Sequence, residues 1–171
     1  MFWLNLSNYT LEKLQNIYPN VKFYGPPYPI VKRDVKIAQN TKIGENTYIG
    51  INTKIGKNCK IMYNVSFSKD VVVGDDVFIG PNVTFLNDKY PPTSISLPAI
   101  VSNDVIIGGG SIIGPDIEIQ RGAVVGMGSV VTKDVSEDIV VIGNPARYYC
   151  SRNEYNKKQE KLIRTNQSIN I

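Results

Sequence analysis

The sequence predicts an all-β solenoid in which very short parallel strands stack as triangular coils. A six-residue period runs from Val35 to Asp134 with one interruption and gives fifteen hexads. The third residue of the hexad is apolar in all fifteen, the fourth is Gly in eight, and the sixth is Asn or Asp in twelve. A hexad cannot bury its own apolar residue, so such units are stable only when they stack into a continuous core.

Each hexad is expected to form one strand followed by one sharp turn. The apolar third residue points inward, and Gly, Asn or Asp occupies the turn because these residues tolerate backbone conformations that bulkier ones resist. With three hexads in each coil, residues 35–147 should form about five triangular coils. Ten extra residues break the period after Asp88, so a loop over residues 86–98 should protrude from the solenoid.

The segment 1–34 precedes the clear repeat and is predicted to hold one short helix. Thr10 is the expected N-cap, and Leu11, Leu14 and Ile17 fall on one helix face. The first residues have neither the charged start nor the long apolar run of a signal peptide, which predicts a soluble, cytoplasmic protein. We assign this segment no chemistry.

The segment 148–171 should form a C-terminal helix and a tail. Its sequence after Ser151, RNEYNKKQEKLIRTN, places opposite charges four residues apart. The expected pairs are Glu154 with Lys158 and Glu160 with Arg164. The basic character of this helix is typical of a solvated face.

Composition restricts the chemistry that the chain can perform. It has 171 residues, 19 Lys and Arg against 15 Asp and Glu, and no histidine. Imidazole bases, Ser-His or Cys-His nucleophile pairs and His-ligated metals are therefore excluded, and Cys59 and Cys150 lack metal-binding spacing. A net charge of +4 does not indicate nucleic acid, and no apolar run is long enough for a membrane helix, so we expect neither partner.

The residues that precede the inward positions change from lysine in the early coils to apolar side chains in the later ones. Large exposed apolar patches usually mark interfaces, which favours a homo-oligomer; the alternative is that the loop or the tail covers them. These later residues are Val72, Phe78, Ile100, Ile106, Ile112, Val124 and Val130.

The motifs AVVGMGSVVTKDV and GNPAR close the repeat region. With the hexads, they resemble the hexapeptide-repeat acyltransferases, which implies a left-handed parallel β-helix, a homotrimer and acetyl-CoA as acyl donor. The resemblance implies that Gly109 and Met127 line the pantetheine arm in a groove between subunits. It places Thr132, Lys133 and Arg147 at the nucleotide end of the donor, where cations suit phosphates.

Blander interpretations remain for these residues. Lys133 and Arg147 would also be explained as ordinary surface charges. The stretch VIIGGGSIIG is explained as repeat turns, although bare backbone from Gly108 to Gly110 would let a thin ligand approach. It is not a dinucleotide-binding loop, because residue 113 is Ile where that motif needs Gly.

The loop resembles the one that carries a catalytic histidine in many members of the family. Here Tyr90 stands before Pro91, and tyrosine with a pKa near ~10 is a poor base at neutral pH. An amine acceptor can attack a thioester directly, without a base. We expect Asn87 to orient that amine, Asp88 to hold it or to receive its proton, and Tyr90 to contact the acceptor. Turn formation is the alternative role for Asn87 and Asp88.

The strings FIGPN and TFLNDKYP resemble the branch that N-acetylates nucleotide-linked amino sugars, including 3-amino sugars. That resemblance implies a dTDP- or UDP-linked amino sugar as acceptor and no metal cofactor. Two rivals stay open: an O-acetyltransferase of sugars or antibiotics on the same fold, and a non-catalytic β-helix scaffold.

Overall fold

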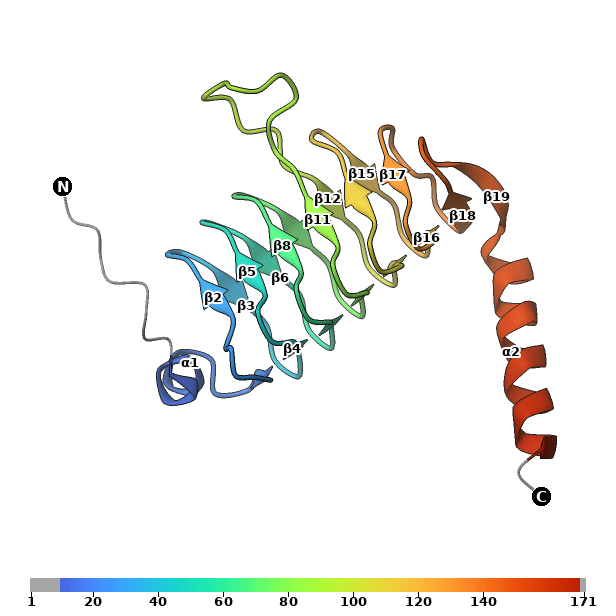
Figure 1. Ribbon diagram of the computed structural model, residues 1–171, viewed down its shortest axis with the longest axis horizontal. Coiled ribbons are helices and arrows are strands. Elements are labelled where there is room, and N and C mark those ends of the chain that lie inside the picture. The colour runs from blue at the N-terminus through green and yellow to red at the C-terminus, as the bar shows by residue number, and fades with distance from the viewer. Residues whose placement is uncertain (1–9, 170–171) are drawn as a thin grey trace.

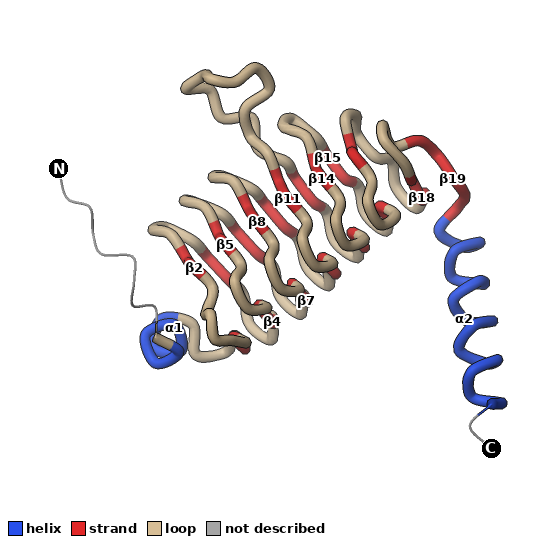
Figure 2. The backbone as a smooth tube through the Cα atoms, viewed as in Figure 1, coloured by secondary structure: helices blue, strands red, loops and turns tan. Residues whose placement is uncertain are grey.

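The chain forms a three-faced parallel β-helix with one protruding loop and a helix at each end (Figure 1). A computed structural model describes residues 10–169. Successive strands go to successive faces, so each coil adds one two-residue strand to each of three sheets, and long turns separate the strands (Figure 2). This arrangement agrees with the left-handed parallel β-helix expected from the sequence.

Three sheets make up the faces. The first sheet contains β1 (Lys22–Phe23), β4 (Lys42–Ile43), β7 (Lys60–Ile61), β10 (Phe78–Ile79), β13 (Ile106–Ile107), β16 (Val124–Val125), β18 (Ile139–Ile142) and the antiparallel β19 (Arg147–Ser151). The second sheet contains β2 (Ile30–Val31), β5 (Tyr48–Ile49), β8 (Ser66–Phe67), β11 (Thr84–Phe85), β14 (Ile112–Ile113) and β17 (Val130–Val131). The third sheet contains β3 (Lys36–Ile37), β6 (Lys54–Ile55), β9 (Val72–Val73), β12 (Ile100–Val101) and β15 (Glu118–Ile119).

The solenoid is longer than the five predicted coils. The first sheet has seven parallel strands, from β1 to β18, so coiling begins at Lys22 and continues to Ile142. Val21, Phe23 and Val31, which lie in the segment set apart as N-terminal, are buried in the same core. The proline-rich stretch 25–29 hides the first coil from a period count, because it lengthens the turn between β1 and β2.

The core is the column of inward third residues. Phe67 and Phe85, on neighbouring strands of the second sheet, are at most 1% exposed, and their rings stack with centroids 4.9 Å apart. Thr41, Thr47 and Thr53 are buried first residues of hexads, and each hydroxyl donates to a carbonyl of the next coil. Small polar residues at the corners are thus satisfied without disturbing the apolar column.

Three corners join the sheets. The first corner follows β1, β4, β7, β10, β13 and β16; the second follows the strands of the second sheet; the third follows those of the third sheet. All twelve non-glycine residues with positive φ in the described part of the chain are Asn or Asp at corners. At the first corner the Asn46 side-chain amide donates to Asn64 Oδ1 (2.8 Å), and the Asn64 side-chain amide donates to Asn82 Oδ1 (3.2 Å). The Asn or Asp at the sixth hexad position therefore serves two purposes: it accepts the positive φ of the turn, and its side chain bonds the next coil.

Replacing Asn64 by alanine should lower the free energy of unfolding. Asn64 has φ of 58°, and an alanine in this region costs about 1–2 kcal/mol and also breaks both amide bonds. Asn64→Gly is the matched control, because it loses the same amide bonds without the backbone strain. The urea midpoints should fall in the order wild type, Gly, Ala; equal midpoints for Gly and Ala would contradict the backbone argument.

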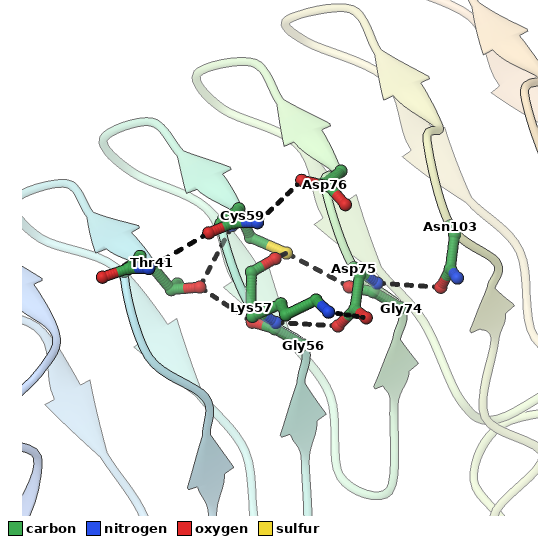
Figure 3. Close-up of polar contacts among 10 residues, drawn as sticks. Thr41, Gly56, Lys57, Cys59, Gly74, Asp75, Asp76 and Asn103 are labelled. Carbon is green, nitrogen blue, oxygen red and sulfur yellow. Dashed lines mark hydrogen bonds and ion pairs between the residues drawn. The ribbon is translucent and has the colours of Figure 1, made fainter.

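The third corner shows how side chains connect successive coils (Figure 3). The Lys57 amide donates to Asp75 Oδ1 (2.9 Å), and the Asp75 amide donates to Asn103 Oδ1 (2.9 Å). The Cys59 thiol donates to the Gly74 carbonyl (3.1 Å), and the Cys59 amide donates to Thr41 Oγ1 (3.1 Å). Nearly every polar group at this corner thus has a partner one coil away, which fixes the register.

The predicted N-terminal helix is present as α1 (Leu11–Ile17), with Thr10 Oγ1 accepting from the Lys13 amide. Only Leu14 of its apolar residues is buried; Leu11 is 39% and Ile17 62% exposed. Residues 1–9 of the predicted N-terminal segment and residues 170–171 of the predicted tail lie outside the described residues.

The C-terminal helix α2 (Arg152–Ile169) contains the predicted Glu160–Arg164 ion pair at 3.7 Å. The predicted Glu154–Lys158 pair forms no direct ion pair, although the two opposite charges still attract each other at longer range. The Glu154 carboxylate instead accepts from the amide and hydroxyl of Ser151 in a capping box, and the Lys158 ammonium donates to the Tyr149 hydroxyl.

The predicted apolar exterior is partly covered by the chain itself. Val124 is 3% exposed and packs with Val140 and Cys150, and Ile106 and Tyr155 pack against this cluster. Strand β19 and the start of α2 thus cover the C-terminal end of the first sheet. Of the predicted residues, Ile100 (47% exposed) and Ile112 (39%) on the other two faces remain open.

Candidate active site

The protruding loop leaves the second corner after β11 and returns before β12 (Figure 1). The Leu97 amide donates to the Asn87 carbonyl (2.8 Å) and closes the base of the loop. The Asp116 amide donates to the Leu97 carbonyl (2.9 Å). The Asp70 amide donates to the Ile51 carbonyl in the same way, between the coils of β5 and β8. The chain therefore rejoins the corner at Leu97, and Asp88 does not fill the turn position that its place in the hexad suggested.

Asn87 is held by a relay of side chains. Its Nδ2 donates to Ser96 Oγ (3.1 Å), and Ser96 Oγ donates to Asp70 Oδ2 (3.0 Å). Asp70 Oδ1 in turn accepts from the Asn52 side-chain Nδ2 (3.0 Å). Because the single hydroxyl hydrogen of Ser96 goes to Asp70, Ser96 can only accept from Asn87, which fixes the orientation of the Asn87 amide. Its Oδ1 has no protein donor among the described residues and is available to a ligand.

Asp88 organises the loop. Its carboxylate accepts from the Thr93 amide (2.7 Å), the Thr93 hydroxyl (2.9 Å) and the Tyr90 amide (3.2 Å). These bonds, the one from the Thr93 amide above all, lower the pKa of Asp88 below its ordinary value of 3.8. A carboxylate in this state is a weak proton acceptor at neutral pH, so its geometry favours loop formation over the predicted proton-accepting role.

Tyr90 lies at the tip of the loop and is 76% exposed. The neighbouring Lys89 forms an ion pair with Asp116 at 3.6 Å, which links the loop to the next coil. An exposed ion pair of this kind adds little stability. The Tyr90 ring therefore faces solvent in one chain, where it is free to meet an acceptor or a second copy.

Gly109 and Met127 lie one above the other at the first corner. The Gly128 amide donates to the Gly109 carbonyl (2.9 Å), and the Gly110 amide donates to the Pro81 carbonyl (2.8 Å). Met127 is 85% exposed, and a Cβ at Gly109 would stand 3.0 Å from the Pro81 ring. Met127 is therefore exposed at this edge, whereas Pro81 packs closely beside Gly109 and fills the space where a side chain would lie.

Lys133 and Arg147 line one cavity of about 200 Å³ at the C-terminal end of the solenoid. The rest of its wall is mainly apolar and includes Val135, Val141 and Tyr148, but the Asp134 carboxylate also lines it. The exposed Thr132 precedes Lys133 at the second corner, after β17. Two cations beside an apolar wall suit a ligand that combines phosphates with a flat or aliphatic group.

One chain does not bring all predicted site residues together. Asn87, Asp88 and Tyr90 lie on the loop of the second corner, whereas Gly109 and Met127 lie at the first corner. The second sheet separates these two corners. Thr132 and Lys133 therefore share the second corner with the loop, and only Gly109 and Met127 lie at the opposite edge of the second sheet.

The other reactive groups of the chain offer no second centre. Burial raises the pKa of the Cys59 thiol, so it is not a nucleophile at neutral pH, and Cys150, on β19, is buried against Val124 and Val140. Within residues 10–169 there is no cluster of three or more Cys, Asp or Glu side chains that could hold a metal ion. Neither helix in that range is long and apolar enough to cross a membrane.

Comparison with known proteins identifies the repeats. The model of the bacterial transferase hexapeptide (six repeats) matches residues 52–87, and the hexapeptide repeat of succinyl-transferase matches residues 98–133. These two stretches of the solenoid are similar to transferase-type hexapeptide repeats. The two matches flank the loop, where the hexapeptide period is broken.

Relatives of this hexapeptide-repeat solenoid are acetyltransferases. The 2,3,4,5-tetrahydropyridine-2,6-dicarboxylate N-acetyltransferase of Clostridium perfringens is 38% identical over 66 residues, which are 39% of this chain and 28% of that protein. The polySia-specific acetyltransferase NeuO has a TM-score of 0.61 at 28% identity, over 69% of this chain and 61% of that one. A hexapeptide-repeat acetyltransferase from Vibrio cholerae O1 biovar eltor, complexed with acetyl-coenzyme A, has a TM-score of 0.54 at 28% identity, over 64% and 69%.

Sequence reasoning missed the partners that hold Asn87. Ser96 lies in the aperiodic loop, and Asp70 is 26 residues away from it, so no spacing connects the two. In the sequence, Asp70 looks like any other Asp at the sixth hexad position, and nothing marks its contact with Ser96. The relay appears only once the loop is folded back on the second corner.

Proposed function

We propose that the protein is an acetyl-CoA-dependent N-acetyltransferase whose acceptor is a nucleotide-linked amino sugar. The acceptor in this proposal is a dTDP- or UDP-linked 3-amino sugar, acetylated in the cytoplasm by a homotrimer. The observation that carries the proposal is the fixed Asn87 amide, which presents a free Oδ1 in a chain that has no histidine. An oriented acceptor oxygen suits an amine, which needs positioning and no base.

The reaction follows from this arrangement. Asn87 Oδ1 accepts a hydrogen bond from the neutral amine and directs its lone pair to the thioester carbonyl carbon of acetyl-CoA. The C–N bond forms, and the carbonyl oxygen becomes an oxyanion that backbone amides stabilise. Collapse breaks the C–S bond, and the excess proton on nitrogen leaves with the CoA thiolate, so that amide and free thiol are the products. Proximity supplies much of the acceleration.

Support for the donor site comes from its chemistry. The exposed Met127 side chain and the side-chain-free Gly109 are proposed to line the pantetheine arm, and Lys133 and Arg147 line one cavity with Tyr148 at its wall. The similarity to an acetyltransferase complexed with acetyl-coenzyme A points in the same direction. No other part of the proposal rests on that similarity.

The homotrimer is proposed because the loop residues and the predicted pantetheine residues, Gly109 and Met127, lie at different corners of one chain. A second copy related by rotation about an axis parallel to the solenoid would place the loop of one subunit beside the first corner of the next. Ile112 on the second face and Ile100 on the third face are still exposed and suit such an interface. Each site would then combine residues from two subunits.

Arg147→Ala should weaken acetyl-CoA binding roughly 10-fold or more, because a hydrogen bond to a charged group contributes about 1.5–3 kcal/mol. The fold should be unchanged, since the Arg147 side chain bonds only its neighbour's carbonyl, that of Ala146. Arg121→Ala, which removes an exposed arginine that does not line the cavity, is the control. Titration calorimetry measures both; an unchanged dissociation constant for Arg147→Ala would show that the donor phosphates bind elsewhere.

The proposal as a whole is tested by release of free thiol from acetyl-CoA in the presence of nucleotide-linked amino sugars. Turnover with hydroxyl acceptors at a matching rate would favour the O-acetyltransferase alternative. The scaffold alternative predicts no turnover and no change in melting temperature with acetyl-CoA. A bound donor at 100 times its dissociation constant should stabilise the fold by about 2.7 kcal/mol.

A further inference from the structure

A second cavity lies at the first corner, on the N-terminal coils and away from the residues already discussed. Its volume is about 170 Å³. Its wall combines two lysines, two tyrosines and one carboxylate, with apolar residues between them. The lining residues are Tyr24, Lys42, Gly44, Glu45, Lys60, Ile61, Met62 and Tyr63.

The two lysines face the same way on neighbouring strands. Lys42 on β4 pairs in register with Lys60 on β7, and adjacent strands are about 4.8 Å apart. Like charges directly opposite each other are destabilising. Among the described residues neither ammonium forms an ion pair, although Lys60 lies over the Phe78 ring at 5.9 Å from its centroid. An anion with two charges would relieve this repulsion.

The tyrosines give the cavity aromatic edges. Tyr24 is 40% and Tyr63 is 41% exposed, and the Lys22 ammonium lies over the Tyr24 ring at 4.8 Å from its centroid, so Tyr63 is the more open of the two rings. Flat rings beside cations suit a nucleobase joined to phosphates. Glu45 is an acceptor only, so it repels phosphate but can accept hydrogen bonds from ribose hydroxyls or a base N–H.

The cavity belongs to the same column as the proposed donor residues. The Asn64 amide donates to the Glu45 carbonyl (3.0 Å), and the Asn82 amide donates to the Tyr63 carbonyl (3.2 Å). The column continues through Pro81 to Gly109 and Met127. The loop arises in the coil of β10 to β12, which lies between the coils of the cavity and those of Gly109 and Met127.

We propose that this cavity binds the nucleoside diphosphate of the acceptor substrate. Lys42 and Lys60 contact the diphosphate, Tyr24 and Tyr63 contact the base, and Glu45 contacts the ribose. The sugar then extends along the first corner to the level of the loop, where the amine meets the acetyl group arriving from the opposite end. The inference rests on the proposed function and adds to it the part of the chain that selects a nucleotide-linked acceptor.

The test is direct binding of dTDP, UDP and inorganic pyrophosphate, measured by titration calorimetry without acetyl-CoA. The variant is Lys42→Ala with Lys60→Ala, and the matched control is Lys36→Ala with Lys54→Ala. The control residues form the same in-register pair on the third sheet, beside Val72 in place of an aromatic ring. A nucleoside diphosphate should bind wild type and control equally and the variant at least 10-fold more weakly.

Three results would overturn the inference. They are binding of no nucleoside diphosphate, equal loss in variant and control, and pyrophosphate affinity equal to that of the nucleoside diphosphates. Arg147→Ala must keep nucleoside diphosphate binding; its loss there would assign the binding to the donor cavity. Thermal melting of each variant checks the fold, which should hold because exposed like charges are being removed.

Kinetics separate this inference from the proposed function. If acetyl transfer occurs and the variant lacking both Lys42 and Lys60 shows an unchanged KM for the acceptor, the cavity does not bind the nucleoside diphosphate and the proposed function stands. If the cavity binds nucleoside diphosphates as described but no amino sugar is acetylated, the cavity stands and the proposed function fails.

Discussion

Asn87→Ala should lower kcat/KM for the amino sugar by about 10²-fold and leave acetyl-CoA affinity unchanged. The variant removes the oxygen that orients the amine, and loss of reactant alignment of this kind costs about two orders of magnitude. Folding should be spared, because the bond that closes the base of the loop uses the Asn87 backbone carbonyl. Steady-state kinetics and calorimetry with acetyl-CoA measure the two effects.

Ile95→Ala is the control for Asn87→Ala. Ile95 lies in the same loop, is 63% exposed and forms none of the relay contacts. It should retain wild-type turnover. Wild-type activity in Asn87→Ala would remove Asn87 from the site, and an equal loss in Ile95→Ala would assign the effect to loop structure in general.

Phe67→Ala should cause the largest loss of stability, about 3–5 kcal/mol in the free energy of unfolding. Phe67 is fully buried, and truncation leaves a cavity at the centre of the triangular column. It also breaks the stack with Phe85, whose ring plane is inclined by 8° to that of Phe67. An aromatic pair adds about 0.5–1.5 kcal/mol beyond the burial of its area. Urea unfolding followed by circular dichroism measures the change.

Phe67→Leu is the matched control for this prediction. Leucine fills most of the space, so it should cost clearly less than alanine at the same position. The β-helix stacks each coil only on its neighbours, so the loss should also loosen the loop that leaves the coil above. Equal destabilisation by alanine and leucine would show that the stack, and not the filled volume, holds this part of the core.

Much of the fold could be predicted because several positions of each hexad are restricted to the same few residue types throughout the repeat. The inward residue, the turn residue and the spacing all require the same coil, so errors at one position do not shift the register. The first coil was missed because the prolines near Gly25 lengthen its turn, and the coil after Asp134 was missed because its spacing departs from six. Periodicity does not detect coils with irregular turns.

The cover over the first sheet could not be predicted from the hexads. Val124 and Ile106 have the same outward pattern as Ile100 and Ile112, yet Cys150 and Tyr155 pack on them. That packing depends on β19 turning back antiparallel on β18, and no local pattern marks this reversal. An outward apolar residue therefore does not show by itself whether the chain covers it, since Ile100 and Ile112 remain exposed.

The sequence indicated a candidate site but not how its residues are arranged. The broken period marked the loop, and the missing histidine directed attention to Asn87. The sequence did not show that Asp88 folds back on Thr93, or that Ser96 and Asp70 fix the Asn87 amide. These contacts depend on the loop conformation, which follows no repeat.

The most direct measurement is thiol release from acetyl-CoA with two acceptors compared side by side. One is a dTDP-linked 3-amino-3,6-dideoxyhexose, and the other is the same sugar with a hydroxyl in place of the amine; UDP-linked pairs extend the comparison. The histidine-free account predicts rapid release with the amine and none above background with the hydroxyl. Equal release with both would contradict direct amine attack and require a general base, and no release with any amino sugar would contradict the proposed N-acetyltransferase activity.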